Sequence, residues 1–394
     1  MIRVLVVDDS VVVRRLIVDS LTGAPNIEVV GTAANGLLAQ AKIDQLKPDA
    51  VTMDIEMPEM DGIAAVRELR KRHKHLPVIM FSTLSASGAS ATLEALSAGA
   101  TDYVTKPSNV GSIAESIAAV REQLVPKIHA LAGRRPPGPP ARTGPVPGRP
   151  GLNPALAARP GGPVPGRPGL TARPGAPSGP GPARPVRRAV PAGRIDILAI
   201  GSSTGGPDAL TKVLQALPTD LPVPIVVSQH MPPVFTRMFA ERLDRSTPLR
   251  VVEAGDGMEL APGTVYIAPG DRHLVLRRRG TATLTQLSDA PPENSCRPAV
   301  DVMFRSVAAL YGASAFAAVL TGMGHDGRGG AKVLREAGAE ILAQDEASSV
   351  VWGMPGAVVG AGLADEILPL DRIAGAFIQR VKTGRTSRPT AVTR

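Results

Sequence analysis

A serine surrounded by small residues is the first candidate for chemistry in this chain. The segment "GSSTG", Gly201–Gly205, matches the pattern G-x-S-x-G and has Ser203 at its centre. In that pattern a sharp strand-to-helix turn exposes the serine hydroxyl, and the helix N-terminus offers N–H groups to an oxyanion. A phosphate-binding loop and an ordinary turn use the same small residues, although the segment lacks the lysine of a P-loop. The pattern alone leaves all three interpretations open.

A nucleophilic serine needs a base, and the base needs an acid that orients it. The last 200 residues contain three histidines, His230, His273 and His325. His230 follows the apolar segment "VPIVVSQ", and Asp326 follows "AFAAVLTGMGH". Because both come after strand-like segments, we expect them at the sheet edge that carries Ser203. The sequence predicts Ser203 as nucleophile, His230 as base and Asp326 as acid, although each residue alone could equally be a turn or cap.

Carboxylates follow two predicted strands in the first third of the chain. Asp8 and Asp9 follow "MIRVLVV", and Asp54 follows "DAVTM". Carboxylates that meet at one edge of a parallel sheet repel one another, and a hard cation such as Mg²⁺ relieves this. Ser82 and Lys106 follow two further predicted strands and are suited to binding a phosphoryl group. Each residue alone is better explained as a helix cap, but the set predicts a metal and phosphoryl site.

These side chains need a sheet to bring them together, and residues 1–130 have the pattern of one. Short apolar segments alternate with amphipathic, helix-like segments such as "VVVRRLIVDSL". The alternation predicts an α/β fold, a doubly wound parallel sheet covered by helices on both faces. The predicted strands are Ile2–Val7, Ile27–Ala33, Ala50–Met53, Val78–Ser82 and Asp102–Val104.

The pattern of apolar segments in residues 194–384 predicts a second α/β domain of the same class. The alternating segment "RHLVLRRRGTATLTQL" predicts an antiparallel hairpin added to its sheet. The predicted parallel strands are Ile195–Ile200, Ile225–Ser228, Thr264–Ala268, Phe316–Leu320 and Glu340–Ala343.

The composition of residues 131–193 predicts a flexible linker, and residues 385–394 are predicted to be a disordered tail. The linker is rich in Pro, Gly and Arg and repeats the segment "GPVPGRPGL". Proline removes backbone donors and glycine raises the entropic cost of ordering, so no core is expected there. Eleven arginines and no acidic residue lie between positions 134 and 194, which accounts for the whole net charge of +9. Both predicted domains are therefore close to neutral, which argues against a DNA-binding output and against other nucleic-acid partners.

Composition also limits where the chain works. Its one cysteine, Cys296, excludes a disulfide framework within the chain. The start "MIRVLVVDDS" lacks the long apolar region of a signal peptide, and no apolar run is long enough to span a membrane. We therefore expect a cytoplasmic location without membrane insertion.

The segments "VLVVDDS", "AVTMDIEMPEMDG", "VIMFST" and "DYVTKP" together resemble the receiver domain of two-component response regulators. The resemblance implies a flavodoxin-like fold and a histidine kinase that phosphorylates Asp54. The Mg²⁺ ligands that it implies are Asp8, Asp9, Asp54 and the backbone carbonyl of Glu56. The switch residues that it implies are Ser82, Tyr103 and Lys106.

The segments "AIGSSTGGP", "VSQHMPPVFTRMFAERL", "VYIAPGDRHL", "RPAVDVMFRSVA" and "LTGMGHDG" resemble the catalytic domain of chemotaxis protein-glutamate methylesterases, the CheB family. The resemblance implies a Rossmann-like domain in which Ser203, His230 and Asp326 form the triad. It also implies that Thr204 and Met323 line the site, with the Met323 N–H as an oxyanion donor, and that Arg237 lies near the substrate cleft.

The activity that this resemblance implies is hydrolysis of glutamate γ-methyl esters on the cytoplasmic helices of chemoreceptors, which serves sensory adaptation. Deamidation of receptor glutamines is implied as a second activity, and ester hydrolysis is expected to need no cofactor. Phosphorylation of the receiver is expected to regulate both. The chain departs from the family at Cys296, where related sequences often have histidine before Arg-Pro; we interpret Cys296 as an ordinary small residue.

Overall fold

The computed structural model describes residues 1–107, 112–133 and 193–383. The predicted tail and nearly all of the predicted linker lie outside the described residues. Helix α5 (Ile113–Ala132) continues two residues past the predicted end of the first domain at residue 130.

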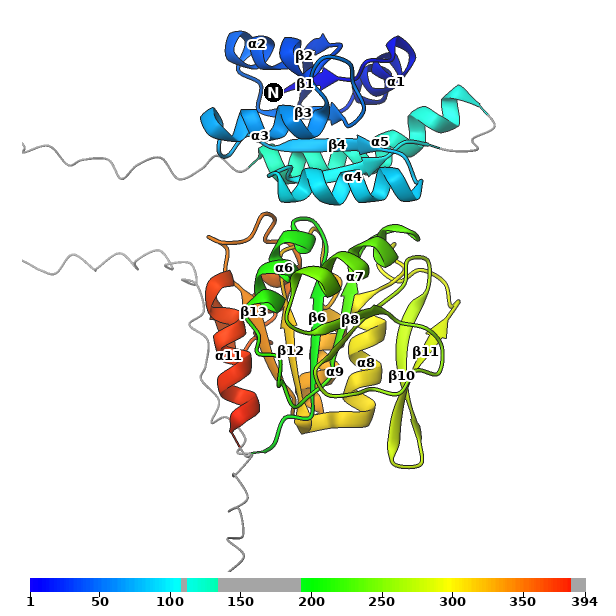
Figure 1. Ribbon diagram of the computed structural model, residues 1–394, viewed down its shortest axis with the longest axis vertical. Helices are drawn as coiled ribbons and strands as arrows, with labels where there is room; N and C mark the ends of the chain where they lie inside the picture. Colours follow the sequence, from blue (N-terminus) through cyan, green and yellow to red (C-terminus); the bar gives the residue numbers. More distant parts are fainter. Residues whose placement is uncertain (108–111, 134–192, 384–394) are drawn as a thin grey trace, which may run out of the picture. The chain divides into compact units, whose positions relative to one another are not determined.

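The first domain is a five-stranded parallel sheet in the order β2-β1-β3-β4-β5 (Figure 1). This is the flavodoxin-like order, in which the carboxyl ends of β1 and β3 lie side by side. The predicted strands all form, and each boundary agrees within one residue. The strands are β1 (Ile2–Val7), β2 (Ile27–Ala33), β3 (Ala50–Asp54), β4 (Val78–Ser82) and β5 (Asp102–Thr105). The remaining helices are α1 (Val11–Leu21), α2 (Gly36–Leu46), α3 (Gly62–Arg72) and α4 (Ala86–Ser97).

Strand β1 explains why helices cover both faces of this sheet. Its alternate residues are buried in two different clusters. Val4 and Val6 pack with residues of α1 and α5, whereas Leu5 and Val7 pack with residues of α2 and α3. Successive side chains of a strand point to opposite faces, so a strand with no polar face requires cover on both sides.

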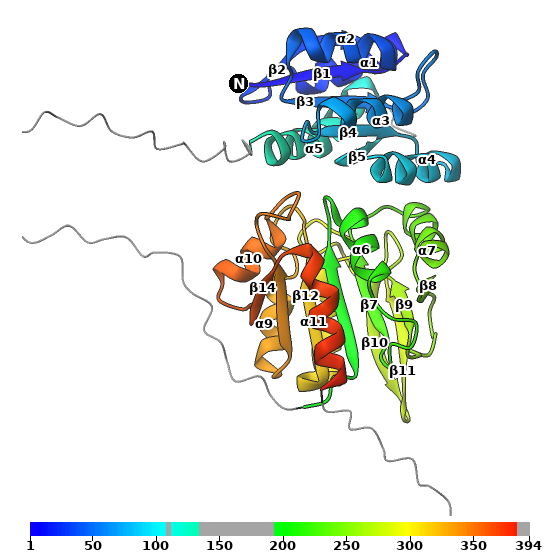
Figure 2. The same cartoon turned by 60° about the vertical axis from the view of Figure 1, so that its left-hand side comes forward.

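The second domain has a seven-stranded parallel sheet in the order β14-β13-β12-β6-β7-β9-β8. Helices α6, α7 and α11 cover one face, and α8, α9 and α10 cover the other (Figure 2). The strands are β6 (Ile197–Ser202), β7 (Ile225–Gln229), β8 (Arg250–Glu253), β9 (Thr264–Ile267), β12 (Ala315–Val319), β13 (Glu340–Gln344) and β14 (Glu366–Leu368). The helices are α6 (Gly206–Gln215), α7 (Phe235–Ser246), α8 (Val300–Tyr311), α9 (Arg328–Glu336), α10 (Met354–Gly360) and α11 (Leu370–Lys382), with the short 3₁₀ helix η1 (Gly312–Ser314).

The predicted α/β fold with two parallel sheets is confirmed. Two edge strands were not predicted, β8 and β14, which are short and only partly buried. An edge strand has fewer buried positions, so its apolar pattern is weaker.

The predicted hairpin also forms, as β10 (His273–Arg279) and β11 (Ala282–Ser288). It makes a two-stranded sheet of its own and does not extend the large one. Leu274 and Leu276 on one face of β10 join the cluster that contains Phe304 and Val307 of α8. The hairpin is therefore held to the domain through side-chain packing on α8 and through backbone hydrogen bonds between β11 and residues 257–260.

The position of β6 decides where chemistry can occur in this domain. Strand β6 pairs with β7 on one side and with β12 on the other. The order of the strands reverses at β6, and ligands bind at such switch points outside the carboxyl ends of the strands. Each predicted residue of the triad follows one of these strands. Ser203 follows β6, His230 follows β7 and Asp326 follows β12.

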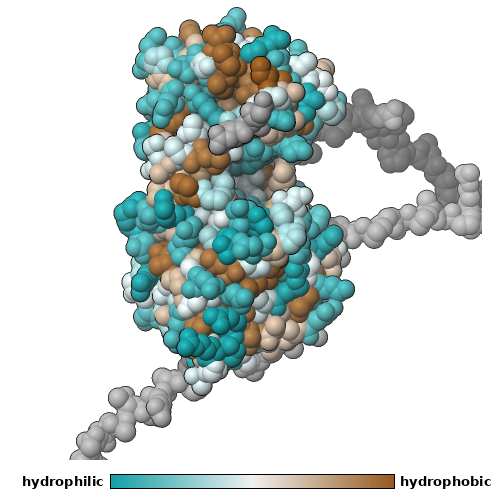
Figure 3. Space-filling view, turned by 90° about the vertical axis from the view of Figure 1, so that its right-hand side faces the viewer, coloured by the Kyte–Doolittle hydropathy of each residue, from teal (hydrophilic) through white to brown (hydrophobic). Residues whose placement is uncertain are grey.

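The surface in Figure 3 mixes polar and apolar residues. Among the described residues the most exposed large apolar residues are Ile113, at 79%, and Met1 and Val12, each at 78%. None of the helices in the described part of the chain combines the length and the apolar character needed to cross a bilayer.

Candidate active site

The turn that carries Ser203 is shaped by glycines. Gly205 has a φ of 75° and caps α6, a left-handed conformation that suits glycine. A Cβ on Gly206 would lie 2.0 Å from Oε1 of Gln229. The chain therefore turns tightly from β6 into α6, which confirms the predicted strand-turn-helix context of Ser203.

Gln229 joins the nucleophile turn to the strand that carries the base. Its side chain is buried at the end of β7. Its Nε2 donates to the carbonyl oxygens of Ser203 at 3.0 Å and of His230 at 3.2 Å, and its Oε1 accepts from the Ser202 hydroxyl at 2.7 Å. One side chain thus fixes the backbone on both sides of the site.

The predicted base and acid form a pair. His230 Nε2 lies 2.8 Å from Oδ2 of Asp326, which is 2% exposed. The backbone N–H groups of Val300 and Asp301, at the N-terminus of α8, donate to the same carboxylate at 2.6 and 3.0 Å. Burial alone raises the pKa of Asp326, but the hydrogen bond from His230 and these N–H groups outweigh it and lower the pKa. Asp326 is held as a carboxylate that orients the imidazole.

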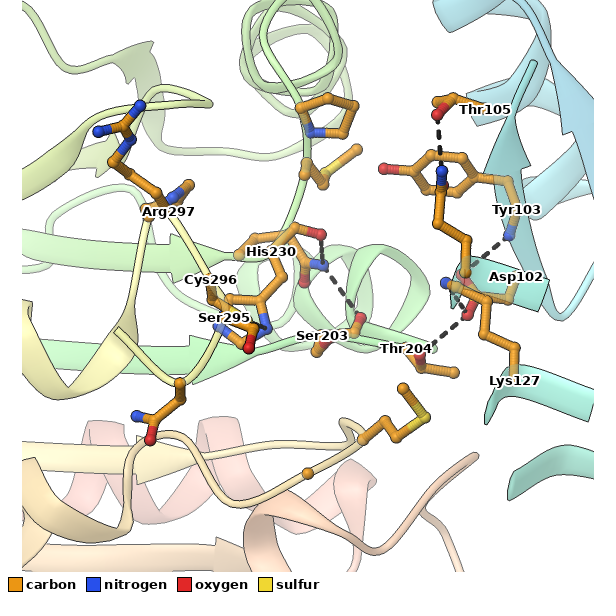
Figure 4. A pocket seen from close by; sticks show the side chains of 18 of the residues that line it. Asp102, Tyr103, Thr105, Lys127, Ser203, Thr204, His230, Ser295, Cys296 and Arg297 are labelled. Carbon is orange, nitrogen blue, oxygen red and sulfur yellow. Dashed lines mark hydrogen bonds and ion pairs between the residues drawn. The ribbon is translucent and has the colours of Figure 1, made fainter. Parts of the chain in front are cut away.

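The predicted nucleophile and the predicted base line the same pocket (Figure 4). The hydroxyl of Ser203 makes no hydrogen bond with another residue in the described ranges. The other ring nitrogen of His230, Nδ1, makes a hydrogen bond of 3.5 Å with Sγ of Cys296. The pocket has a volume of about 680 Å³. Its lining includes Ser203, Thr204, His230, Cys296, Arg297 and Met323.

Two backbone N–H groups beside Ser203 are available to an oxyanion. The N–H of Ser203 itself donates to the carbonyl of Thr321 at 3.0 Å and is not free. Within the described ranges the N–H groups of Thr204 and Met323 have no hydrogen-bond acceptor. Both residues line the pocket, so they are the donors that a tetrahedral intermediate would meet.

The surroundings of His230 change its basicity. Burial lowers the pKa of His230, but the hydrogen bonds to Asp326 and Cys296 raise it overall, to about 9. A protonated imidazole cannot accept the serine proton, so the neutral fraction grows as the pH rises. The pair with Asp326 stabilises the folded state below the ordinary histidine pKa of about 6.5, and this contribution is lost as the pH rises through about 9.

We expect kcat/KM for ester hydrolysis to increase about tenfold per pH unit between pH 7 and 8 and to level off near pH 9, because only the neutral His230 acts as a base. The measurement is methanol release at several pH values, corrected for hydrolysis without enzyme. An inflection at the ordinary histidine pKa of about 6.5 would contradict this assignment.

The other two histidines do not enter the site. His273 is fully buried; its Nδ1 accepts the N–H of Ala299 at 3.1 Å, and its Nε2 lies 3.1 Å from the carbonyl oxygen of Pro291. His325 is exposed. Arg237, which the resemblance placed near the cleft, lies exposed on α7 and is not among the residues that line the pocket, whereas Arg297 is.

Receiver residues contact this pocket as well, and both domains belong to one compact unit. The hydroxyl of Thr204 donates to Oδ2 of Asp102 at 2.8 Å, and Lys127 pairs with the same oxygen at 2.5 Å. Tyr103 stacks on Phe235 with ring centroids 4.9 Å apart. Figure 4 shows Asp102, Tyr103 and Lys127 beside Thr204. Thr204, directly after the candidate nucleophile, is therefore hydrogen-bonded to Asp102, directly before the predicted switch residue Tyr103.

The residues of the predicted phosphorylation site lie close together in the receiver. Lys106 Nζ lies 2.7 Å from Asp54 and 3.4 Å from Asp8. Burial and the neighbouring Asp54 raise the pKa of Asp8 to about 6. Asp9, Asp54, Glu56 and Ser82 line a cavity of about 240 Å³ next to Lys106. The Ser82 hydroxyl donates to the carbonyl of Gly88 at 3.1 Å and accepts from Thr92 at 2.6 Å.

The arrangement of these carboxylates fits a hard cation. Ligand oxygens of Asp8, Asp9 and Asp54 lie within 4.8 Å of one another. Oδ2 of Asp8 is buried and its one polar contact in the described structure is the 3.4 Å ion pair with Lys106. A buried carboxylate oxygen with so few partners, beside two further carboxylates, is the donor set that Mg²⁺ prefers.

The comparisons with known proteins match both domains. A family model described as CheB methylesterase matches residues 198–377, and one described as response regulator receiver domain matches residues 4–118. A protein-glutamate methylesterase/protein-glutamine glutaminase of Nocardioides sp. is 52% identical over 386 residues, which are 98% of this chain and 97% of that protein. The chain belongs to the CheB methylesterase family.

Other members of the CheB methylesterase family are nearly as similar. A protein of the same name from Trichodesmium erythraeum is 45% identical over 96% of this chain and 99% of its own length. The crystal structure of the Thermotoga maritima CheB methylesterase catalytic domain is 44% identical, covers 47% of this chain and 98% of that one, and has a TM-score of 0.46. The predicted family, a hydrolase with a receiver domain, is confirmed.

Sequence reasoning missed several residues that shape this CheB active site. Gln229, Arg297 and Asn294 carried no motif signal of their own. Gln229 was detectable in principle, because a polar residue directly before the predicted base ends an otherwise apolar strand. Cys296, interpreted as an ordinary small residue, contacts the ring of His230.

Proposed function

We propose that this chain hydrolyses γ-methyl esters of glutamate residues on the cytoplasmic helices of chemoreceptors, under control of receiver phosphorylation. The observation that carries the proposal is a pocket lined by Ser203, by His230, whose ring is 2.8 Å from Asp326, and by two residues whose N–H groups lack acceptors in the described structure. The names of the relatives supply the substrate class. The same attack on a glutamine side chain would release ammonia, so deamidation is a second activity of this proposal.

The triad assignment gives a two-step reaction. Ser203 Oγ attacks the ester carbonyl while His230 takes its proton, and the N–H groups of Thr204 and Met323 bind the oxyanion. The C–O bond to the methoxy group breaks, the imidazolium returns the proton, and methanol leaves. His230 then takes a proton from water as the water oxygen attacks the acyl carbonyl. The C–O bond to Ser203 breaks and the imidazolium returns the proton to Ser203 Oγ, so the products are a glutamate side chain, free Ser203 and neutral His230.

For the receiver, we propose Asp54 as the residue that takes a phosphoryl group from a histidine kinase. Asp8, Asp9, Asp54 and the carbonyl of Glu56 would hold Mg²⁺, which supplies charge neutralisation for the phosphoryl oxygens. Lys106, 2.7 Å from Asp54, is placed to bind one of these oxygens. Ser82 and Tyr103 are the proposed switch residues.

The proposed domain limits are residues 1–130 for the receiver, 131–193 for a linker and 194–384 for the catalytic domain, followed by a tail. Between residues 134 and 192, and in the tail from residue 384, these limits rest on composition alone. A cytoplasmic location stays a prediction.

The experiment that tests this function is methanol release from a methylated chemoreceptor cytoplasmic fragment, with and without acetyl phosphate and Mg²⁺. We expect release by the full chain and faster release after phosphorylation. A fragment with glutamine in place of methyl glutamate should release ammonia under the same conditions. Absence of methanol release in both states would contradict the proposed substrate.

A further inference from the structure

Residues Glu293–Cys296 form a tight turn of unusual conformation next to the triad. The backbone N–H of Glu293 donates to the carbonyl of Cys296 at 3.1 Å, and the reverse bond is 2.9 Å. The two central residues, Asn294 and Ser295, have φ angles of 52° and 61°. Two consecutive left-handed residues that are not glycine are rare, and such strain persists where the surroundings hold it in place.

Ion pairs hold the turn from both sides. The guanidinium of Arg305, on α8, makes two hydrogen bonds to the Glu293 carboxylate, at 2.7 and 2.5 Å. Arg297, directly after the turn, donates to Asp271 at 2.9 and 2.5 Å. Planar two-point contacts of this kind fix orientation as well as distance. The turn is therefore anchored independently of the triad.

The first central residue of the turn binds the triad acid. Asn294 Nδ2 donates to Oδ1 of Asp326 at 3.0 Å and to Oδ2 of Asp301 at 2.9 Å. Both carboxylates are buried, at 2% and 5% exposure. With the amide reversed, its oxygen would face two carboxylates, so the hydrogen-bond network assigns nitrogen to this position. The Asn294 amide thus lies between two negatively charged carboxylates and donates a hydrogen bond to each.

The same turn also contacts the triad base. Cys296 Sγ, two residues after Asn294, lies 3.5 Å from Nδ1 of His230. The other nitrogen of that ring is bonded to Asp326. Side chains from a single turn therefore touch both members of the acid–base pair. These contacts add to the backbone N–H groups that α8 donates to Asp326.

We propose that the turn Glu293–Cys296 is a positioning element for the triad, with Asn294 as the residue that sets the orientation and the charge balance of Asp326. This rests on the proposed function of Ser203, His230 and Asp326. The charged and titratable groups that face Asp326 are His230, Asp301, Glu293, Arg305 and Cys296. Asn294 adds to these groups a side-chain amide that carries no charge and donates a hydrogen bond to Asp326.

Two substitutions test the role of the Asn294 side-chain amide separately from the role of the backbone conformation of the turn. Asn294→Gly keeps a residue suited to positive φ but removes the amide, so we expect kcat to fall about 10- to 100-fold with KM changed less than about threefold, as for a small misplacement of a catalytic group. Asn294→Asp is isosteric but adds a third carboxylate beside Asp301 and Asp326. The added negative charge favours the protonated imidazole, so the pH dependence of kcat/KM should move to higher pH.

The matched controls are Asn26→Gly and Asn26→Asp. Asn26 is exposed in the receiver and has a φ of 57°, so the same conformational change is made away from the site. We expect no change in kcat for either control. Methanol release measures all four variants, and cooperative thermal unfolding shows that each is folded.

The outcomes distinguish this inference from the function on which it rests. If the wild type releases methanol and Asn294→Gly keeps kcat within about threefold, the inference is overturned and the function stands. If Asn294→Asp keeps the wild-type pH profile, the charge role is overturned. Loss of cooperative unfolding in both Asn294 variants would show that the turn acts through folding, which also contradicts the proposal. An inactive wild type would overturn the proposed function itself.

Discussion

Ser203→Ala should lower kcat for methyl ester hydrolysis by on the order of 10⁴-fold or more, because the acyl-enzyme route disappears with the nucleophile. The fold should survive, since the Ser203 hydroxyl makes no hydrogen bond in the described structure and the backbone of the turn is held by Gln229 and Thr321. The oxyanion donors Thr204 and Met323 stay in place. A small residual activity from binding and oxyanion stabilisation is therefore expected. The measurement is methanol release from a methylated receptor fragment under saturating substrate.

The control for this prediction is Ser246→Ala. Ser246 is exposed at the end of α7, outside the pocket, and loses the same hydroxyl group. It should leave kcat and KM unchanged. If Ser203→Ala kept more than about a tenth of the wild-type kcat while folded, Ser203 would not be the nucleophile. Cys296, 3.5 Å from the same imidazole, would then be the next residue to replace.

Asp54→Asn should abolish activation by phosphorylation and leave basal hydrolysis intact. The amide lacks the carboxylate oxygen that would attack phosphorus, and it also weakens the contact with Lys106 at 2.7 Å. For the wild type, a coupling of about 1–3 kcal/mol corresponds to activation of about 5- to 150-fold by acetyl phosphate and Mg²⁺. The contacts that can carry this coupling are the Thr204–Asp102 hydrogen bond and the stacking of Tyr103 on Phe235.

Asp19→Asn is the matched control for the receiver. Asp19 lies on α1 and pairs with Arg15 at 2.9 Å, away from the carboxylate cluster. Its variant should be activated to the same extent as the wild type. Activation of Asp54→Asn to the wild-type level would show that the phosphoryl group goes elsewhere. Phosphate incorporation and methanol release, measured in the same reaction, separate a failure to phosphorylate from a failure to transmit.

Local sequence patterns were enough to predict most of the fold. The five strands of the receiver were predicted within one residue, because each is a mainly apolar run between amphipathic helices, and all but the edge strand β2 are largely buried. In the second domain prediction failed at the edge strands β8 and β14, which are only four and three residues long and partly buried. The hairpin β10–β11 was predicted from its alternation, but its separation from the large sheet was not, because alternation says nothing about which partner a strand edge takes.

Sequence by itself determined which residues could do chemistry, because a polar residue after a buried strand stands at the carboxyl edge of a parallel sheet wherever that strand lies. Ser203, His230 and Asp326 were found in this way. The pairing of β7 and β12 on the two sides of β6, which brings the three together, is seen only in the folded domain. The fold also places Asn294 and Cys296 next to His230 and Asp326, on a turn held by the Arg305–Glu293 and Arg297–Asp271 pairs. Such contacts join segments far apart in the chain, and they depend on packing of the whole domain, which no local pattern records.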